Sequence, residues 1–381
     1  MGIPARPLPC LGAGRRSIAT DVNDAAPRIP VTLLTGFLGA GKTTLLNRLI
    51  RSPQMAKALV IINEFGSIGL DHDLVARSNE DDTIIEMASG CLCCTIKGDL
   101  RKTLAEAPWR FARQGKRWFD RVVIETTGLA DPAPIIHTVM ADEKLKRQYA
   151  LQSVVTLVDG CNGFHTLEAQ PEASKQAAVA DRLLISKSDL VDPDELAQLV
   201  VRLHKLNPAT EPVVLTPDAF DADELFANRV FNPDLKSGDV RAWLNAEAYS
   251  GGGQEDHHHH HHDHHHDINR HDERIRSVCL TIDEPLPAEV FDGWLDLLVT
   301  FNGVNVLRVK GIINLEELDT PLVIHGVQHI WHPPAILERW PSDDRRSRIV
   351  FIVRDIEETE LRTMLEFATQ SFARTEVIGL A

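Results

Sequence analysis

The turn at residues 36–43 constrains this chain more than any other part of its sequence. It reads Gly-Phe-Leu-Gly-Ala-Gly-Lys-Thr and matches the pattern G-x-x-x-x-G-K-[ST] at every fixed position. The turn directly follows the apolar segment 31–34 and opens the helix-forming segment 42–51. Glycines allow backbone N–H groups to face phosphate oxygens, and a helix N-terminus adds its positive dipole. The sequence therefore predicts a strand, a phosphate-binding loop (P-loop) and a helix, in that order.

Individual side chains should hold a nucleotide together with the loop backbone. We expect Lys42 to reach the β- and γ-phosphates and the Thr43 hydroxyl to ligate Mg²⁺. The apolar segment 121–125 ends in Glu125, which we expect to act through the Mg²⁺ shell or to orient the attacking water. The amide of Gly128, three residues later, is expected to sense the γ-phosphate. The predicted catalytic residues are Lys42, Thr43, Glu125 and Gly128, and the predicted phosphate contacts are Gly36, Gly39, Ala40, Gly41, Lys42, Thr43 and Thr44.

A guanine-binding motif is indicated further along the chain. The segment 184–189 follows another apolar run and ends in Ser-Lys-Ser-Asp, which is similar to the N/T-K-x-D motif of GTPases. Asp189 would accept hydrogen bonds from guanine N1–H and the exocyclic amine, which adenine does not offer with the same polarity. Lys187 would lie along the base. Because Ser186 replaces the more frequent Asn or Thr, the sequence supports guanine selectivity less strongly than phosphate binding.

Apolar runs and helix-length segments alternate from residue 28 to about residue 226. The predicted strands are 31–34, 58–62, 83–86, 121–125, 153–158, 182–185 and 212–215, and the predicted helices include 42–51, 98–114 and 193–206. Continuous apolar runs spaced by helices indicate a mostly parallel sheet that is covered on both faces. We therefore predict the α/β P-loop NTPase fold of a G domain, with a doubly wound sheet.

A second ordered region should begin near residue 274. Its predicted strands are 276–282, 305–311, 322–325 and 348–353, and its predicted helices are 287–301 and 358–370. This pattern predicts a smaller α+β C-terminal domain. We place a disordered tail at 1–28, the GTPase domain at 29–230, a linker at 231–273 and the C-terminal domain at 274–381.

The cysteines suggest a site for a transition metal. Cys91, Cys93 and Cys94 fall within four residues, shortly after the predicted strand 83–86. Thiolates are soft ligands that favour Zn²⁺, Cu⁺ or iron–sulfur chemistry. Three thiolates leave one tetrahedral position open, which suits metal transfer more than permanent structure. We expect Cys161 and Cys279 to be buried, inert thiols.

Histidines form a separate tract, in which they make up ten of the twenty residues 254–273. Such a tract cannot build an apolar core, and its imidazoles bind transition metals with little discrimination. We predict a weak metal collector at His257, His258, His259, His260, His261, His262, His264, His265 and His266. His325, His329 and His332 lie in a segment that looks extended, so their spacing does not predict a metal site.

Composition and hydropathy argue against several classes of partner. The 381 residues carry a net charge of −15, which disfavours a dedicated binder of nucleic acid or of anionic membranes. No apolar run approaches the ~18 residues of a membrane span. Residues 1–28 lack the apolar core of a secretory signal. We expect a cytoplasmic protein without nucleic-acid or membrane partners, and the sequence leaves its oligomeric state open.

Together these motifs resemble the CobW-type metal-chaperone GTPases. The matching segments are 33–46, 63–66, 90–94, 125–132, Asp159 and 186–189, followed by 307–311 and 326–328. The resemblance implies a GTPase that binds a transition metal at Cys91, Cys93 and Cys94 and hands it to a client metalloprotein. It implies GTP, Mg²⁺ and Zn²⁺ as ligands, with Co²⁺ or Fe²⁺ as alternatives, and 63–69 as the nucleotide-responsive segment. Some relatives carry an acidic metal ligand beside the segment 63–66, but this chain has Ile62 and Ser67 there, so no carboxylate ligand is carried over.

Three other interpretations remain open at this point. Within the family, the chain could deliver cobalt for cobalamin assembly or iron to an enzyme such as nitrile hydratase. A passive metal store would use the histidine tract and leave the nucleotide site without a role, which the intact Lys42, Thr43 and Glu125 disfavour. A small-molecule kinase would use the same P-loop but would not explain the cysteine triplet.

Overall fold

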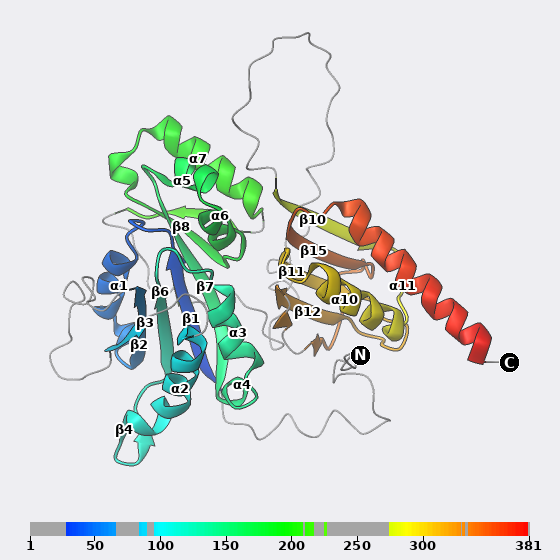
Figure 1. Cartoon of the computed structure of the whole chain (residues 1–381), viewed down its shortest axis with the longest axis horizontal. Coiled ribbons are helices and arrows are strands. Elements are labelled where there is room, and N and C mark those ends of the chain that lie inside the picture. The colour runs from blue at the N-terminus through cyan, green and yellow to red at the C-terminus, as the bar shows by residue number, and fades with distance from the viewer. Residues whose placement is uncertain are drawn as a thin grey trace, which may run out of the picture.

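Two sheets organise the chain. The computed structural model describes residues 28–65, 84–89, 95–208, 210–216, 225–226, 274–328, 330–331 and 334–379. The parallel sheet belongs to an N-terminal domain, and an antiparallel sheet with two helices forms a separate C-terminal domain beside it (Figure 1).

The N-terminal sheet has seven strands, and every neighbouring pair is parallel. The strands are β1 (Ile29–Gly36), β2 (Ala58–Phe65), β3 (Ile84–Ser89), β6 (Arg121–Thr126), β7 (Tyr149–Asp159), β8 (Arg182–Ser186) and β9 (Pro212–Val214). Their order is β3-β2-β6-β1-β7-β8-β9, so the chain forms β2 and β3 on one side of β1, returns to insert β6 between β2 and β1, and then adds β7, β8 and β9 on the other side. The predicted doubly wound parallel sheet is confirmed.

Helices cover both faces of this sheet. They are α1 (Lys42–Ile50), α2 (Thr95–Arg110), α3 (Ala133–Ala141), α4 (Leu145–Gln148), α5 (Gly163–Ala169), α6 (Pro171–Ala178) and α7 (Pro193–Leu206), with short 3-10 turns at η1 (Pro53–Met55) and η3 (Ser188–Leu190). On β1, Leu33 packs in the cluster that contains residues of α2 and α3, whereas Leu34 packs with α1. Successive residues of a strand point to opposite faces of the sheet. Because helices cover both faces, Leu33 and Leu34 must both be apolar.

One predicted helix extends too far. We expected a helix over 98–114, but α2 ends at Arg110 and is followed by a small hairpin of β4 (Ala112–Arg113) and β5 (Lys116–Arg117). The two residues between these strands, Gln114 and Gly115, have φ angles of 51° and 73°. Positive φ at both central positions is the geometry of a tight hairpin turn, which a helix cannot contain.

The C-terminal domain has an antiparallel sheet with helices. Its elements are β10 (Ile275–Ile282), α10 (Ala288–Asn302), β11 (Val306–Ile313), β12 (Leu322–Val327), β13 (Ile330–Trp331), β14 (Ala335–Ile336), β15 (Ser347–Arg354) and α11 (Glu358–Gly379). Trp294 of α10 lies edge-on to Phe351 of β15 at a centroid distance of 5.9 Å, and both are fully buried. This α+β arrangement matches the predicted one.

The C-terminal sheet buries its second face against the N-terminal domain. Leu307, Val327 and Ile352 belong to the same apolar cluster as Ala178 and Val179 at the end of α6. These interface side chains are all nearly inaccessible to solvent. The two domains therefore share part of one core.

Two predictions about the rest of the chain are not tested by this structure. The predicted tail (1–28) and linker (231–273) lie almost entirely outside the described residues, so the domain boundaries stay predictions.

Among the described helices, none combines the length and the apolar composition needed to cross a bilayer.

Candidate functional site

The predicted nucleotide residues gather at one edge of the parallel sheet. The carboxyl ends of parallel strands lie at the same edge, where ligands of open α/β sheets bind. Gly36 ends β1, Thr126 ends β6, Asp159 ends β7 and Ser186 ends β8. Because these four strands are neighbours in the sheet, their loops meet around the P-loop.

The P-loop backbone requires its glycines. Gly36 has a φ of 141°, and a Cβ atom built on it would lie 2.3 Å from the carbonyl oxygen of Leu157 on β7. Gly41 has a φ of 90° and caps α1. The N-terminus of α1 therefore opens onto a loop that follows β7 closely, and this arrangement suits phosphate binding.

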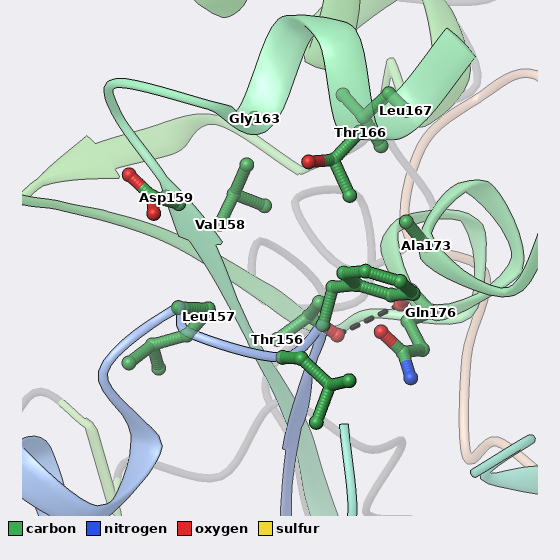
Figure 2. A pocket seen from close by; sticks show the side chains of 12 residues that line it. Thr156, Leu157, Val158, Asp159, Gly163, Thr166, Leu167, Ala173 and Gln176 are labelled. Carbon is green, nitrogen blue, oxygen red and sulfur yellow. Dashed lines mark hydrogen bonds between the residues drawn. The ribbon is translucent and has the colours of Figure 1, made fainter. Parts of the chain in front are cut away.

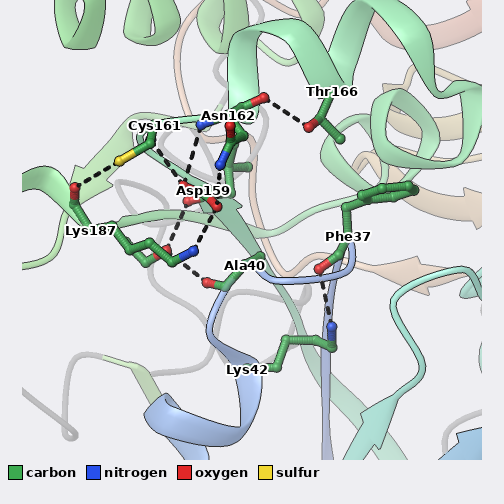
Figure 3. Close-up of polar contacts among 10 residues, drawn as sticks. Phe37, Ala40, Lys42, Asp159, Cys161, Asn162, Thr166 and Lys187 are labelled. Carbon is green, nitrogen blue, oxygen red and sulfur yellow. Dashed lines mark hydrogen bonds and ion pairs between the residues drawn. The ribbon is translucent and has the colours of Figure 1, made fainter. Parts of the chain in front are cut away.

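Lys42 is positioned at the mouth of this loop. Its side chain is 8% exposed, and its ammonium donates to the carbonyl oxygen of Gly36 at 2.9 Å. It also donates to the carbonyl oxygen of Phe37 at 3.2 Å (Figure 3). The loop thus holds a cation beside the amides of its own turn. This is the charge that β- and γ-phosphates require.

Thr43 on α1 and Glu125 on β6 meet at this edge of the sheet. The Thr43 hydroxyl at the start of α1 donates to Oε1 of Glu125 at 3.2 Å, and Glu125 is only 5% exposed. A hydroxyl and a carboxylate in contact beside a phosphate loop form an oxygen-donor set that fits Mg²⁺. Next to them, the Thr126 hydroxyl donates to the hydroxyl of Thr35 at 2.8 Å and joins β6 to β1.

Gly128 lies directly against the P-loop. A Cβ atom on Gly128 would meet the backbone nitrogen of Leu38 at 2.5 Å and its Cα at 2.7 Å. The segment around it is a tight turn, because the amide of Ala130 donates to the carbonyl of Thr127 at 3.1 Å. The predicted γ-phosphate sensor is therefore in backbone contact with the phosphate loop, which a larger residue would prevent.

Ser186 contributes differently from what the guanine motif suggests. Its hydroxyl donates to the carbonyl of Ala40 in the P-loop at 2.7 Å, so it joins the two nucleotide-binding segments. Lys187 has a left-handed backbone with a φ of 55°, and Asp189 lies exposed in the following turn. The replacement at Ser186 therefore affects a contact between loops, while Lys187 and Asp189 remain available for a base.

Asp159 fixes the Lys187 side chain. The Lys187 ammonium donates to Oδ2 of Asp159 at 2.7 Å, and the amides of Cys161 and Asn162 donate to Oδ1 (Figure 3). Burial by itself would raise the pKa of Asp159, but the hydrogen bonds from Lys187, Asn162 and Cys161 outweigh it and hold the pKa below its usual value. This carboxylate therefore stays ionised and keeps Lys187 in place.

The predicted metal ligands lie outside the described residues. These are Cys91, Cys93 and Cys94 and the whole histidine tract. Within the described part of the chain, no group of three or more His, Cys, Asp or Glu side chains could hold a metal ion. The last described residue before the triplet, Ser89, ends β3 and pairs with Phe65 on β2, so β3 ends at the sheet edge that carries the P-loop.

Two other thiols, and one of the three histidines at 325, 329 and 332, have described positions. Cys161 is exposed, so the expectation that it is buried is wrong; it lies in the loop after β7 rather than in the core. Cys279 on β10 is partly exposed, and burial raises the pKa of its thiol. His325 is buried on β12, in the extended segment that we expected, whereas His329 and His332 lie outside the described residues.

No sequence pattern points to Gln176, which contacts the site from α6. Its amide nitrogen donates to the carbonyls of Gly128 at 3.1 Å and Ala130 at 3.0 Å. Gln176 lies in an otherwise unremarkable alanine-rich helix, and no local pattern marks it.

Two family models match this chain in succession. The nucleotide-binding domain described as CobW/HypB/UreG matches residues 30–214, and the C-terminal domain described as that of the cobalamin synthesis protein CobW matches residues 275–369.

Relatives and solved structures agree with that match. The zinc chaperone YjiA of Escherichia coli K12 is 30% identical over 341 residues, covering 88% of this chain and 96% of YjiA. The zinc-regulated GTPase metalloprotein activator 1 of Schizosaccharomyces pombe is 34% identical over 195 residues, 50% of this chain and 46% of that protein. The crystal structure of Zn(II)-bound YjiA GTPase from E. coli superposes with a TM-score of 0.62 at 26% identity, covering 90% of this chain and 99% of that chain.

Proposed function

Because this chain belongs to the CobW family of P-loop proteins, we propose that it is a GTP-hydrolysing zinc chaperone that transfers Zn²⁺ to a client metalloprotein. The observation that carries the proposal is the partly buried contact between Thr43 and Glu125 beside Lys42 in the P-loop. A vestigial nucleotide site would have no reason to keep a carboxylate, a hydroxyl and an ammonium together. The names of the relatives support both the GTPase activity and the metal.

Hydrolysis would use these groups in distinct ways. Lys42 exchanges its loop carbonyls for the β- and γ-phosphates and offsets their charge. Thr43 and Glu125 would hold Mg²⁺, which when bound offsets the charge on the β- and γ-phosphate oxygens. Gly128 lies against Leu38 of the P-loop, and its amide would face the γ-phosphate. Lys187 and Asp189 would select guanine over adenine.

Zinc would bind at the thiolates of Cys91, Cys93 and Cys94. The support for coupling to the nucleotide is topological, because β2 and β3 end as neighbours at the edge that holds the P-loop. The proposed nucleotide-responsive segment, 63–69, continues from β2, and the cysteine triplet continues from β3. A change in one segment on hydrolysis would alter the thiolate geometry in the other. Such coupling is reciprocal, so zinc must also change nucleotide affinity.

We propose that the protein works in a reducing compartment such as the cytoplasm, where thiolates stay available to zinc. We propose that the histidine tract 257–266 raises the local concentration of metal near the triplet. Its imidazoles would bind transition metals with little discrimination and release them readily, as a collector requires.

Steady-state turnover tests the nucleotide half of the proposal. We expect the full chain to hydrolyse GTP slowly without any acceptor and to bind GTP in preference to ATP. Lys42→Ala should abolish nucleotide binding, while Lys57→Ala, an exposed lysine outside the site, should not. GDP formation that required a second substrate and released no inorganic phosphate would instead indicate a kinase.

Chelator competition tests the metal half. Zinc affinity should differ between the chain loaded with a non-hydrolysable GTP analogue and the chain loaded with GDP. Changing Cys91, Cys93 and Cys94 together to Ser should remove the tight site and leave weak binding at the histidine tract. Equal affinity in both nucleotide states would contradict the coupling. Metal analysis of the same samples also reports whether Co²⁺ or Fe²⁺ replaces zinc.

A further inference from the structure

Helix α6 holds the segment that follows Glu125. Gln176 is fully buried, and its amide nitrogen donates to both Gly128 and Ala130. One residue earlier, the Lys175 ammonium lies 3.7 Å from the carboxylate of Asp131. A single helix therefore contacts the Gly128 loop, by which we mean residues 127–131, at three points.

These contacts restrict how the Gly128 loop can move. Its turn is closed by the Ala130 to Thr127 hydrogen bond, and Gly128 already touches the P-loop backbone on its other side. Gln176 adds two hydrogen bonds to carbonyls that would otherwise have to find new partners in a buried site. The orientation of the peptide groups in the Gly128 loop therefore depends on the position of the Gln176 side chain.

Helix α6 is itself anchored to the sheet beneath the P-loop. The Thr156 hydroxyl on β7 donates to the backbone carbonyl of Gln176 at 2.7 Å (Figure 2). A pocket of about 20 Å³ separates this part of α6 from Phe37 and Leu38 of the P-loop. The helix thus lies next to the phosphate loop. Because the space between them is small, a shift of the helix would also displace the loop.

The end of α6 is held by the other domain. Arg308 on β11 donates to the carbonyl of Val179, the residue that caps α6, and to Oδ1 of Asp181. The Arg308 and Asp181 side chains are 4% and 2% exposed. The second carboxylate oxygen of Asp181 accepts from the amide of Val154 on β7 at 2.9 Å. This ion pair therefore joins the C-terminal domain, α6 and the parallel sheet.

An irregularity in β11 makes this contact available. The pairing of β11 with β15 shifts register between Val306 and Arg308. Leu307 packs in the cluster shared with the N-terminal domain, and Arg308 reaches the same domain, while Val309 packs on the helix side. In a regular strand, Leu307 and Arg308 would point to opposite faces of the sheet. The register shift between Val306 and Arg308 instead lets both side chains point towards the N-terminal domain.

We propose that α6 couples the C-terminal domain to GTP hydrolysis, with Gln176 positioning the Gly128 loop and Arg308 positioning the helix that carries Gln176. The proposal rests on the GTPase activity proposed above. Gln176 touches neither the nucleotide phosphates nor Mg²⁺ in this scheme, so it is a positioning residue. A client or metal that shifted the C-terminal domain would then change the rate of hydrolysis through the same contacts.

The first test replaces the donor amide with an acceptor of the same shape. Gln176→Glu should lower kcat for GTP by about tenfold to a hundredfold, as expected when a reacting group is misplaced. The affinity for a fluorescent GTP analogue should change less than about threefold, because the P-loop is untouched. Gln170→Glu makes the same chemical change at the exposed start of α6 and should leave both values as in the wild type. An unchanged kcat in Gln176→Glu overturns the proposal.

The second test asks whether Arg308 acts through Gln176. Arg308→Lys keeps the charge but loses the two-pronged contact with Val179 and Asp181, and it should lower kcat without weakening GTP binding. Arg346→Lys weakens an exposed ion pair with Asp344 in the same domain and serves as the control. In the double variant with Gln176→Glu, Arg308→Lys should have little further effect. Fully additive losses would mean that the two residues act separately, and the coupling would be wrong.

Amide hydrogen exchange separates this inference from the proposed function. Exchange across residues 127–131 should quicken in both Gln176→Glu and Arg308→Lys, and this measurement needs no hydrolysis. If the wild type hydrolyses no GTP, the proposed function fails, while the exchange result still decides whether α6 links Arg308 to the Gly128 loop. Unchanged exchange in folded Arg308→Lys overturns the link.

Discussion

The contact between Gly128 and Leu38 shows how tightly single residues are specified in this site. The space that a side chain on Gly128 would need is filled by the P-loop backbone at 2.5 Å, and backbone cannot rotate away as a side chain can. Glycine is therefore required by close approach and not by an unusual φ. The same reasoning applies to Gly36 against Leu157, where a positive φ adds to the requirement.

Gly128→Ala should impair hydrolysis more than binding. The added methyl group forces the Gly128 loop away from Leu38, so the amide expected to face the γ-phosphate is displaced. We expect kcat for GTP to fall about a hundredfold, since a displacement of about 1 Å can cost that much. Single-turnover hydrolysis of GTP measures the effect on the rate, and GDP affinity measures the effect on binding. Gly293→Ala on α10, where a Cβ atom meets nothing within 4 Å, should leave activity unchanged.

Asp159 should contribute stability that depends on pH. Its pKa in the folded state is lowered from the usual 3.8, so the contribution is fully present above 3.8 and is lost as pH falls through the lower, folded value. Urea unfolding of the wild type and of Asp159→Asn from pH 7 to pH 2.5 checks this. The difference in unfolding free energy should be constant above about pH 5 and shrink below 3.8. A difference that grew on acidification would contradict the prediction.

Individual elements follow their local signals where these are strong. Helix α7 begins and ends at the predicted residues, 193 and 206, because Asp192 caps it by accepting from the Asp194 amide at 2.9 Å and Pro193 begins it. The predicted strands lie within the observed ones or differ by a residue at an end. In contrast, α2 ends early because Gln114 and Gly115 turn the chain, and a glutamine gives little warning of a positive φ.

The cap of α7 can be tested by substitution. Asp192→Ala removes the acceptor for a helix N-terminal amide and should destabilise the protein by about 1 kcal/mol. Asp192→Asn keeps an acceptor oxygen and should cost only a fraction of that. Thermal or urea unfolding of the two variants, compared with the wild type, measures the difference. Equal destabilisation by both would point to charge and not to the hydrogen bond.

The whole molecule is held together by a shared core. Leu307, Val327 and Ile352 of the C-terminal sheet are buried in a cluster of the N-terminal domain, and the Arg308–Asp181 pair lies beside them. One face of the C-terminal sheet packs on α10 and α11, and its other face is also apolar, so that second face is buried against the N-terminal domain. We therefore expect the two domains to unfold together.

Truncation at the interface should weaken this cooperativity. Leu307→Ala removes a side chain that is 1% exposed, and a buried leucine replaced by alanine costs about 2–5 kcal/mol. Calorimetry should find a single transition in the wild type and a lower, broader or split transition in the variant. Leu298→Ala, equally buried but within the C-terminal core, should lower stability without uncoupling the domains. Two separate transitions already present in the wild type would contradict the shared core.

Spacing within a few residues was enough to predict the order of strands and helices, the P-loop, and the residues expected to hold phosphate. It could not specify which distant groups brace that site. Gln176 and Gly128 are separated by 48 positions, and Arg308 and Asp181 by 127, and each pair meets only when the sheet and the domain interface have formed. The contact of Ser186 with the P-loop and the hold of the C-terminal domain on α6 became visible only in the folded chain. Hydrogen bonds and buried charges are satisfied by whichever partner the fold brings near, and no local pattern encodes that partner.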